Sequence, residues 1–444
     1  MARVVGGTSA LGETRPSRVL LRQVAGLVSF LLVIGATQAC AGGFQSQEQS
    51  VRGLGGAHSM EATGSGADFL WWNPAAIGGM DEIEIYVGVH GILADASVRD
   101  LGSTISRPFA PVAPIGGSSQ SDPVGAAVSP NFAVAGRIDP RWSWGLAVTT
   151  PYGFITSVEP DSWTRYQALN LRMMQVSLQP TLAYRATPWL DLGFGLDAAY
   201  AESRLTTRLP NLSPLLADGQ STVRGHGWDF GWIAGLTVRP NGRLTLAASY
   251  RSRIEHRLGG EATTSDLLGP LSAGNGVVPS VTRFTTPWLL TVGGRWRLNE
   301  RWVVSAQAVS SGWSAFDTIQ VDRPGGAPQP SRRARDTTSF SLGAEFEASP
   351  QWTVRAGLQY DPQAIADSAM LADGDRLTTA VGATYRAGAR VSLDLAAAYT
   401  RFRTSPIASD ATAYRGTPLQ TPVTLAGQFS ARAPMFSAGA RWRF

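Results

Sequence analysis

The chain has 444 residues, of which 43% are hydrophobic and 16% are charged. Soluble globular domains contain about 25% charged residues, so this composition requires an apolar environment around part of the surface. A single cysteine excludes a disulfide scaffold. The formal net charge is +5, but no run of basic residues is long enough to indicate a nucleic-acid groove, and no nucleic-acid partner is expected.

The first segment has the features of an export signal. Arginines precede an apolar run at 24–35 that is too short to cross a bilayer comfortably. Small residues follow, and Ala39-Cys40-Ala41 fits the A-x-A pattern of signal peptidase sites. We predict a signal peptide over residues 1–41. A short membrane anchor and a lipid-modified Cys40 are the alternatives, but no stop-transfer charges follow the run and Thr37-Gln38 suits lipidation poorly.

The exported part has no apolar run of about 20 residues, so no transmembrane helix is expected. Polar and apolar residues alternate instead with period two. Between 352 and 360, one face carries Trp, Val, Ala, Leu and Tyr, and the other carries Thr, Arg, Gly and Gln. The stretches at 340–347, 391–399 and 436–444 alternate in the same way. Apolar faces with aromatic residues at both ends indicate a lipid-facing band flanked by aromatic girdles.

About fourteen such segments are expected, an even number as in single-chain bacterial barrels. Tight turns such as Asp139-Pro140 and Ser349-Pro350 alternate with long loops rich in Gly, Pro and Ser. We predict an all-β fold: a 14-stranded antiparallel transmembrane β-barrel over residues 83–444, in the bacterial outer membrane. The expected strands are 83–98, 126–138, 141–155, 169–186, 189–208, 222–240, 243–259, 280–298, 301–316, 334–348, 351–366, 374–388, 391–406 and 430–444.

Residues 42–82 precede the first strand and are glycine-rich, with a short helical turn expected at 59–63. A barrel of this size encloses a lumen wide enough to leak. We predict that 42–82 forms an N-terminal hatch inside the lumen, and a periplasmic tail is the alternative. Gly53, Gly55 and Gly56 would then allow close passage of the backbone.

A series of stretches carries a family resemblance, in order along the exported chain. They are GGFQSQEQSVRGLGGAHS, Asn73-Pro74-Ala75, TTPYGFITSVEPDSW with RYQAL, QPTLAYRATPWLDLGFGLDAAYAESRL, AASYRSRIEHRLGGEA, DTTSFSLGAEFEASPQWTVRAGLQYD, DGDR and the terminal aromatic strand. Together they resemble the FadL-type outer-membrane transporters of long-chain fatty acids and aromatic hydrocarbons (OMPP1/FadL/TodX). The resemblance implies passive transport of hydrophobic compounds through a hatch-filled barrel, with an apolar lumenal pocket.

The resemblance also implies candidate substrate-binding residues. Phe44 matches the family's near-terminal hatch phenylalanine and is expected to contact substrate, with hatch packing as the alternative. Trp71 and Trp72 would line the pocket or, equally well, anchor the hatch. No cofactor and no metal are expected.

Lateral release through a gap at a kink in the third strand is the route that the family implies. The kink is expected at Pro151, Tyr152 and Gly153, because proline cannot donate to the ladder and glycine tolerates a bend. An ordinary strand end is the alternative. The hatch gate is expected at Asn73, Pro74 and Ala75 beside this gap, where the asparagine would bond backbone that the kink leaves unpaired; a plain Asn-Pro turn is the alternative.

Arginines expected to face the lumen raise the question of a charged cargo. Arg172, Arg295, Arg297 and Arg355 would neutralise a fatty-acid carboxylate, although we favour pairing with lumenal acids. The acids expected for this pairing are Glu345, Glu347 and Asp394. The arginines at 332, 333 and 335 lie in a predicted outer loop and would contact lipopolysaccharide phosphate or solvent.

No catalytic constellation is present in the sequence, and no enzyme is expected. The histidines at 58, 90, 226 and 256 have neither metal-ligand nor Ser/His spacing. The rival function is a general diffusion porin or a structural barrel. Expected partners are hydrophobic small molecules, outer-membrane lipid, lipopolysaccharide and, through the terminal Phe444, the barrel-assembly machinery; a monomer is expected.

Overall fold

The computed structural model describes residues 44–123, 125–316, 319–322, 334–366, 368, 371 and 373–444. The predicted signal peptide over 1–41, the hatch residues 42 and 43, and the arginines at 332 and 333 lie outside the described residues. In the described part, no helix has the length and apolar character needed to cross a membrane.

The described residues form one antiparallel sheet of 22 strand segments. Their bounds are β1 (Glu84–Leu93), β2 (Asp95–Asp100), β3 (Thr104–Ile105), β4 (Ala113–Pro114), β5 (Gln120–Ser121), β6 (Ala126–Arg137), β7 (Trp142–Ser157), β8 (Asn170–Thr187), β9 (Leu190–Leu209), β10 (Gly219–Asn241), β11 (Leu244–Arg251), β12 (Ile254–Ser265), β13 (Gly276–Thr286), β14 (Leu289–Arg297), β15 (Trp302–Ser311), β16 (Gln320–Asp322), β17 (Thr337–Glu347), β18 (Trp352–Asp361), β19 (Arg376–Arg386), β20 (Val391–Phe402), β21 (Ser405–Ala413) and β22 (Thr421–Arg443).

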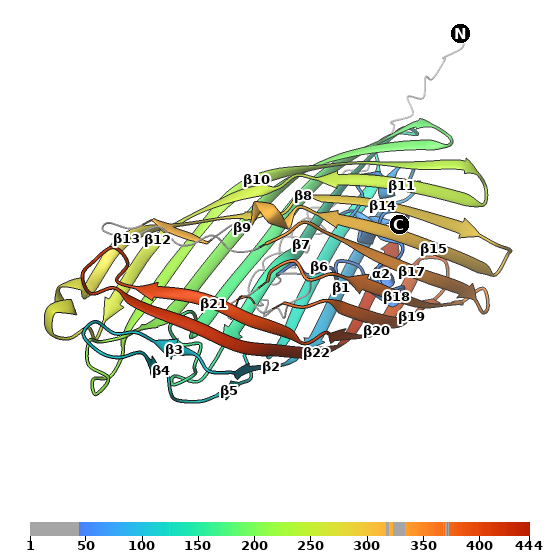
Figure 1. Cartoon of the computed structure of the whole chain (residues 1–444). Coiled ribbons are helices and arrows are strands. Elements are labelled where there is room, and N and C mark those ends of the chain that lie inside the picture. Colours follow the sequence, from blue (N-terminus) through green and yellow to red (C-terminus); the bar gives the residue numbers. More distant parts are fainter. Residues whose placement is uncertain are drawn as a thin grey trace, which may run out of the picture. The chain divides into compact units, whose positions relative to one another are not determined.

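Several segments continue one another and act as one wall strand. β11 and β12 pair with opposite halves of β10, and β14 and β13 continue in the same way beside them. Pro287 separates β13 from β14, because proline has no N–H to give to a ladder. β1 pairs with both β6 and β22, which closes the ring (Figure 1). The wall is the predicted closed barrel of 14 antiparallel strands, although its last strand begins at Thr421, earlier than expected.

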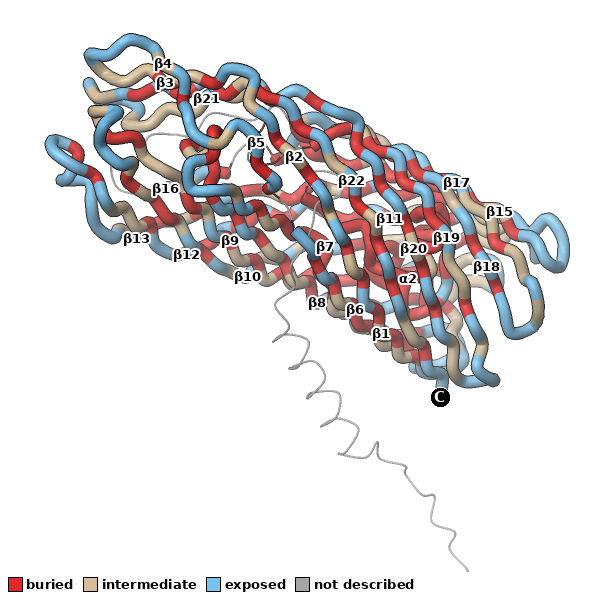
Figure 2. Tube along the Cα trace, turned by 90° about the horizontal axis from the view of Figure 1, so that it is seen from below, coloured by how far each residue is buried: buried red, intermediate tan, exposed pale blue. Residues whose placement is uncertain are grey.

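The two faces of the wall strands differ as the alternation predicts. Trp352 is 44% exposed and Val354 40% exposed, whereas Thr353 and Arg355 between them are buried. Figure 2 shows this change of burial from residue to residue along the strands. Aromatic side chains form cross-strand pairs near the tight turns, including Trp352 and Tyr385 with ring centroids 4.8 Å apart. The outer face therefore has the apolar band and aromatic girdle of a lipid-facing barrel.

The segment before β1 lies inside the barrel as a hatch. It contains the helix α2 (Val51–Gly55) and the single turns η1 (Ala67–Phe69) and η2 (Pro74–Ile77). Two further turns, η3 (Gly269–Gly274) and η4 (Trp313–Ala315), belong to loops of the wall. The hatch helix lies earlier than the predicted 59–63, because the Ser50 hydroxyl caps it by accepting the N–H of Gly53 at 3.3 Å.

Buried irregular backbone requires hydrogen-bond partners, and the inward-facing polar side chains of the wall supply them. Gln307 accepts the N–H of Ala62 at 2.8 Å, and Gln179 donates to the carbonyl of Leu70 at 2.7 Å. At one close approach of the hatch to the wall, both sides are glycine: a Cβ on Gly382 would lie 2.7 Å from the Cα of Gly55. The polar face of the barrel is thus the binding surface for its own hatch.

Candidate functional site

An apolar cluster inside the barrel surrounds the first described residue. Phe44 is fully buried, and its ring lies edge-on to four other aromatic rings. The centroid distances are 4.9 Å to Phe316, 5.1 Å to Trp313, 5.8 Å to Tyr152 and 6.4 Å to Phe284. We call this group, with the apolar side chains packed on it, the Phe44 cluster; its further members are Phe154, Ala168, Leu171, Met173, Ala201, Leu258, Ile319, Ala364, Ile365 and Leu371. It joins the hatch to walls and loops far apart in the sequence.

The third wall strand, β7, is irregular where it meets this cluster. Thr149 lies opposite Ser177 of β8, but Tyr152 lies opposite Gln175. Two residues of β7, Thr150 and Pro151, therefore face one residue of β8, which is the pattern of a β-bulge. Residues 150 and 151 thus interrupt the ladder, and Tyr152, which follows them, contacts Phe44.

On its other edge, β7 separates from β6. Their ladder runs from Arg137 and Ser143 to Phe132 and Val148 and ends there, whereas β6 continues to pair with β1 as far as Ala126. Among the described residues, six positions of β6, 126–131, therefore have no ladder partner on the β7 side. The Ser129 and Thr150 hydroxyls, 2.7 Å apart, connect the two strands in this stretch.

The start of the hatch occupies the edge of β7 that β6 leaves. The N–H of Ser46 donates to the carbonyl of Pro151 at 2.8 Å, and the N–H of Gly153 donates to the carbonyl of Phe44 at 3.0 Å. Gln45 and Tyr152 form an antiparallel bridge. The sequence predicted Phe44 as a substrate contact and Tyr152 as part of the strand kink, and the two side chains are in direct contact in the structure.

The Asn-Pro-Ala triplet lies elsewhere, and the expectation that it sits beside the gap at β7 is wrong. Asn73 donates to the carbonyl of Ala62 at 2.7 Å and to the Thr237 hydroxyl of β10 at 3.2 Å. Its side-chain oxygen accepts the N–H of Ala75 at 2.9 Å and caps η2. Gly193 on β9 and Gly235 on β10 leave the space that Pro74 and Asn73 fill, so the missing side chains of the wall decide where the turn docks.

Trp71 and Trp72 are buried in a second apolar cluster with Leu289 and Val309. They do not join the Phe44 cluster. The carbonyl of Trp72 accepts the Ser249 hydroxyl at 2.6 Å. Arg251 lies over the ring of Trp71 at 4.2 Å from its centroid and donates to the carbonyl of Trp71. These contacts fasten the middle of the hatch to β11.

Arg251 is also the partner of a buried acid, so replacing it should lower the stability of the folded barrel. It is 4% exposed and forms an ion pair with Asp197. Replacement Arg251→Met leaves the Asp197 carboxylate buried without a cation, which costs about 3–5 kcal/mol. We expect the folded, heat-modifiable form to melt at a clearly lower temperature in detergent. The double variant Arg251→Met with Asp197→Leu should regain most of the loss; equal melting of the single variant and the natural protein would contradict the prediction.

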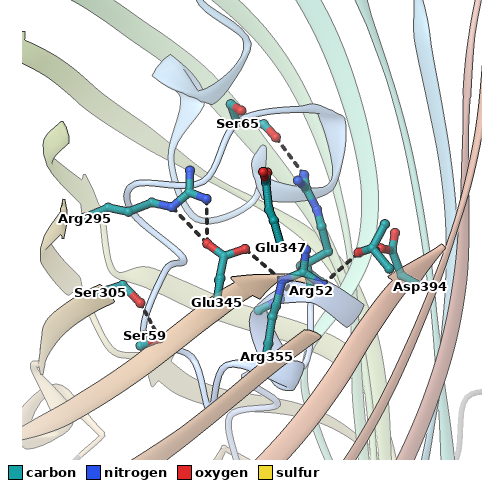
Figure 3. A network of polar contacts seen from close by, with 12 residues as sticks. Arg52, Ser59, Ser65, Arg295, Ser305, Glu345, Glu347, Arg355 and Asp394 are labelled. Carbon is teal, nitrogen blue, oxygen red and sulfur yellow. Dashed lines mark hydrogen bonds and ion pairs between the residues drawn. The ribbon is translucent and has the colours of Figure 1, made fainter. Parts of the chain in front are cut away.

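Lumenal arginines pair with acids rather than standing free. Glu345 accepts from both Arg295 at 2.9 Å and Arg355 at 3.0 Å (Figure 3), and Asp394 accepts from Arg441 at 2.9 Å. Of the expected arginines, Arg297 is exposed near the tight turns and lines a small polar cavity there.

Arg172 does not face the lumen, and that prediction is wrong. The side chain is exposed, while its neighbours Leu171 and Met173 point into the Phe44 cluster. Because side chains alternate strictly along a strand, two inward apolar neighbours place the arginine outside.

The family profile described as outer membrane protein transport protein (OMPP1/FadL/TodX) matches residues 32–444. The chain belongs to this family. The long-chain fatty acid transport protein of Escherichia coli O6:H1 is 25% identical over 405 residues, covering 82% of this chain and 88% of that protein. Outer membrane protein P1 of Haemophilus influenzae is 23% identical over 414 residues, covering 84% and 89%.

Solved structures of OMPP1/FadL/TodX proteins share the fold. A Pseudomonas aeruginosa FadL homologue superposes with a TM-score of 0.79 at 20% identity, covering 91% of this chain and 100% of that chain. The toluene transporter TodX of P. putida gives 0.63 at 19% identity, covering 88% and 99%. The protein is therefore an outer-membrane β-barrel of a transport family, and it is not an enzyme.

Three of the four histidines contact polar side chains inside the barrel, and the fourth is exposed. His58 meets Glu61 at 2.9 Å, His90 meets the Ser437 hydroxyl at 2.7 Å, and His256 meets Asp229 at 3.2 Å. His226 is exposed beside Tyr200. Within the part of the chain that the structure describes, no three His, Cys, Asp or Glu residues are grouped as metal ligands.

Proposed function

We propose that this protein carries hydrophobic compounds passively through the outer membrane, holding them in the Phe44 cluster and releasing them sideways between β6 and β7. One observation carries the proposal: the hatch edge at Phe44–Ser46 occupies β7 where the β6–β7 ladder has ended. The aromatic cluster and the unpaired stretch of wall therefore meet at the same short segment.

The physics of the route favours an apolar cargo. Lipopolysaccharide presents a polar layer to such molecules, and a lumenal site spares them that barrier. Each Å² of apolar surface buried contributes about 25 cal/mol, and the side chains around Phe44 are apolar and aromatic. A cargo molecule would replace the Phe44 ring among them, and moving Phe44 breaks its backbone contact with Gly153. Loading and opening at β7 are thereby coupled.

The hatch residues divide into two roles in this proposal. Phe44 and Tyr152 contact cargo, and Pro151 and Gly153 hold the hatch edge. Trp71, Trp72, Asn73, Pro74 and Ala75 anchor the hatch to the wall rather than gating it. We also propose contact of the outer loops with lipopolysaccharide, recognition of Phe444 by the assembly machinery, and a monomer.

Uptake by whole cells tests the role of Phe44. Cells that lack their own transporter of this kind and express the protein should take up a labelled hydrophobic compound faster than cells with empty vector. Phe44→Ala removes the ring whose displacement couples loading to opening at β7, and we expect uptake to fall about tenfold, the ratio that 1.4 kcal/mol gives. The control Phe340→Ala removes a ring that is 58% exposed on the lipid face and should leave uptake within twofold. Equal uptake by both variants would remove Phe44 from the pathway.

A porin is the rival, and permeability to sugars separates the two. The described hatch backbone is bonded to the wall on many sides, so liposomes containing the protein should not swell in small sugars. Rapid swelling together with no uptake of hydrophobic compounds would establish the porin instead.

A further inference from the structure

The cations around the Phe44 cluster are already neutralised, and this bears on the chemical class of the cargo. Arg376, at the start of β19, is buried and forms ion pairs with Asp361 and, at 3.5 Å, with Asp373. Asp373 in turn accepts the N–H groups of Ala364 at 2.8 Å and Ile365 at 3.2 Å, two members of the Phe44 cluster. The arginine at this side of the cluster therefore has two carboxyl partners.

Protonation of Asp373 would not leave Arg376 without a carboxylate partner. Asp373 lies in the segment between β18 and β19, and burial raises the pKa of its carboxyl while Arg376 acts in the opposite direction. If Asp373 holds a proton, Arg376 still keeps its ion pair with Asp361. Gln47 of the hatch also donates to Asp361 at 2.8 Å, which ties the pair to the segment that begins with Phe44.

The second arginine near the cluster also has a carboxylate and hydrogen-bond partners. Arg251 has its ion pair with Asp197 and donates to the carbonyl of Trp71 and to Gln179. His256, which stacks on Phe284 of the cluster at 4.7 Å, pairs with Asp229 at 3.2 Å. In either protonation state this pair contributes no net positive charge.

The hatch adds a further acid to this region. Glu48, four residues after Phe44, is 2% exposed and accepts the Ser46 hydroxyl at 2.9 Å. Among the described residues, no cationic side chain lies within ion-pair distance of its carboxylate. Arg335, next to Ala334 at the margin of the cluster, is exposed and donates to the carbonyl of Gln363. The buried groups around the cluster thus contain more acids than arginines.

Building on the proposed function, we infer that the cargo of the Phe44 cluster is an uncharged hydrocarbon or neutral lipid, and that long-chain carboxylates are rejected there. A carboxylate leaving water needs a cation or several hydrogen-bond donors in compensation. Here it would meet paired arginines and additional carboxylates, and its charge would be repelled. An uncharged molecule of the same length meets mainly aromatic and aliphatic side chains, and the buried Tyr152 hydroxyl is a polar group among them.

A pair of substrates that differ only in charge tests this inference. Whole cells as above are given labelled dodecanoate or its methyl ester at pH 7, with the E. coli long-chain fatty acid transport protein expressed in parallel cells as the reference. We expect the ester to enter at least tenfold faster than with empty vector and dodecanoate to stay at the vector rate. If neither compound enters, the proposed function fails; if dodecanoate enters as fast as the ester, this inference fails and the proposed function stands.

A gain of carboxylate uptake tests whether these groups set the preference. The double variant Asp361→Asn with Asp373→Asn keeps the shape of both side chains and leaves Arg376 without a carboxylate partner. We expect dodecanoate uptake to rise at least fivefold. The control Asp191→Asn removes a buried acid that pairs with Arg185 and Arg239 away from the cluster and should change nothing. If the double variant does not assemble, Glu48→Gln should still raise dodecanoate uptake at least threefold; an unchanged rate in the assembled variant would overturn the assignment.

Discussion

Uptake of hydrophobic compounds should stop when β6 and β7 are cross-linked. Ser129 and Thr150 face each other with their hydroxyl oxygens 2.7 Å apart, in the stretch where no backbone ladder joins the strands. Replacing both by cysteine places two thiols at a separation that suits a disulfide. The bond would close the proposed lateral exit, so we expect oxidised cells to take up cargo at the vector rate and reduced cells to recover.

The wall offers a matched control for this experiment. Thr378 and Thr400 have hydroxyl oxygens at the same distance, 2.7 Å, on β19 and β20, which are paired along their whole length. A disulfide between cysteines at these two positions should leave uptake unchanged. Transport that continues with Ser129→Cys and Thr150→Cys fully oxidised would rule out exit between β6 and β7.

Gly357→Val should turn the barrel into a leaky channel. A Cβ at Gly357 of β18 would overlap the carbonyl oxygen of Gly56, so the backbone of the hatch must shift to make room. The valine therefore pushes the hatch from the wall, while the ladder from β18 to its neighbours Gly343 and Ala380 is retained. We expect proteoliposome swelling in small sugars to rise at least tenfold, with cells becoming sensitive to a large antibiotic such as vancomycin.

A glycine that faces away from the hatch is the control for this leak. Gly259 of β12 is exposed, and a Cβ there would meet nothing within 4 Å. Gly259→Val should assemble and remain sealed. If Gly357→Val assembles and remains sealed, the prediction that close packing of Gly357 against Gly56 seals the lumen is wrong.

The paired arginines show how far sequence reasoning reaches into the lumen. Alternation placed Arg355 and Glu345 on the inner face correctly, and their ion pair follows because they lie opposite each other on β18 and β17. Arg172 failed under the same rule because the phase of β8 is set by Leu171 and Met173, whose inward direction depends on a cluster assembled from distant segments.

The sequence indicated that a segment fills the lumen, but not which wall strands that segment contacts. Its glycines and lack of period indicated a segment that fills the lumen, yet nothing local indicates which wall strand an irregular turn will meet. Asn73 lies 164 positions from Thr237 of β10, to which it donates, and the docking site is decided by glycines on β9 and β10. Phe44 was found from the family resemblance, whereas its contact with Phe316 and Trp313 had no signal in the sequence.

By itself, the sequence determined the strand number, the two faces of the wall and the presence of a filling segment. Period-two alternation is a local property that the bilayer imposes on every strand, because lipid accepts only apolar side chains and fully paired backbone. Only the tertiary structure decided where the hatch replaces β6 along β7, and which buried carboxylates neutralise Arg376 and Arg251. Those outcomes depend on contacts across the lumen between residues far apart in the chain, and such contacts follow from the closure of the ring and not from any repeating pattern.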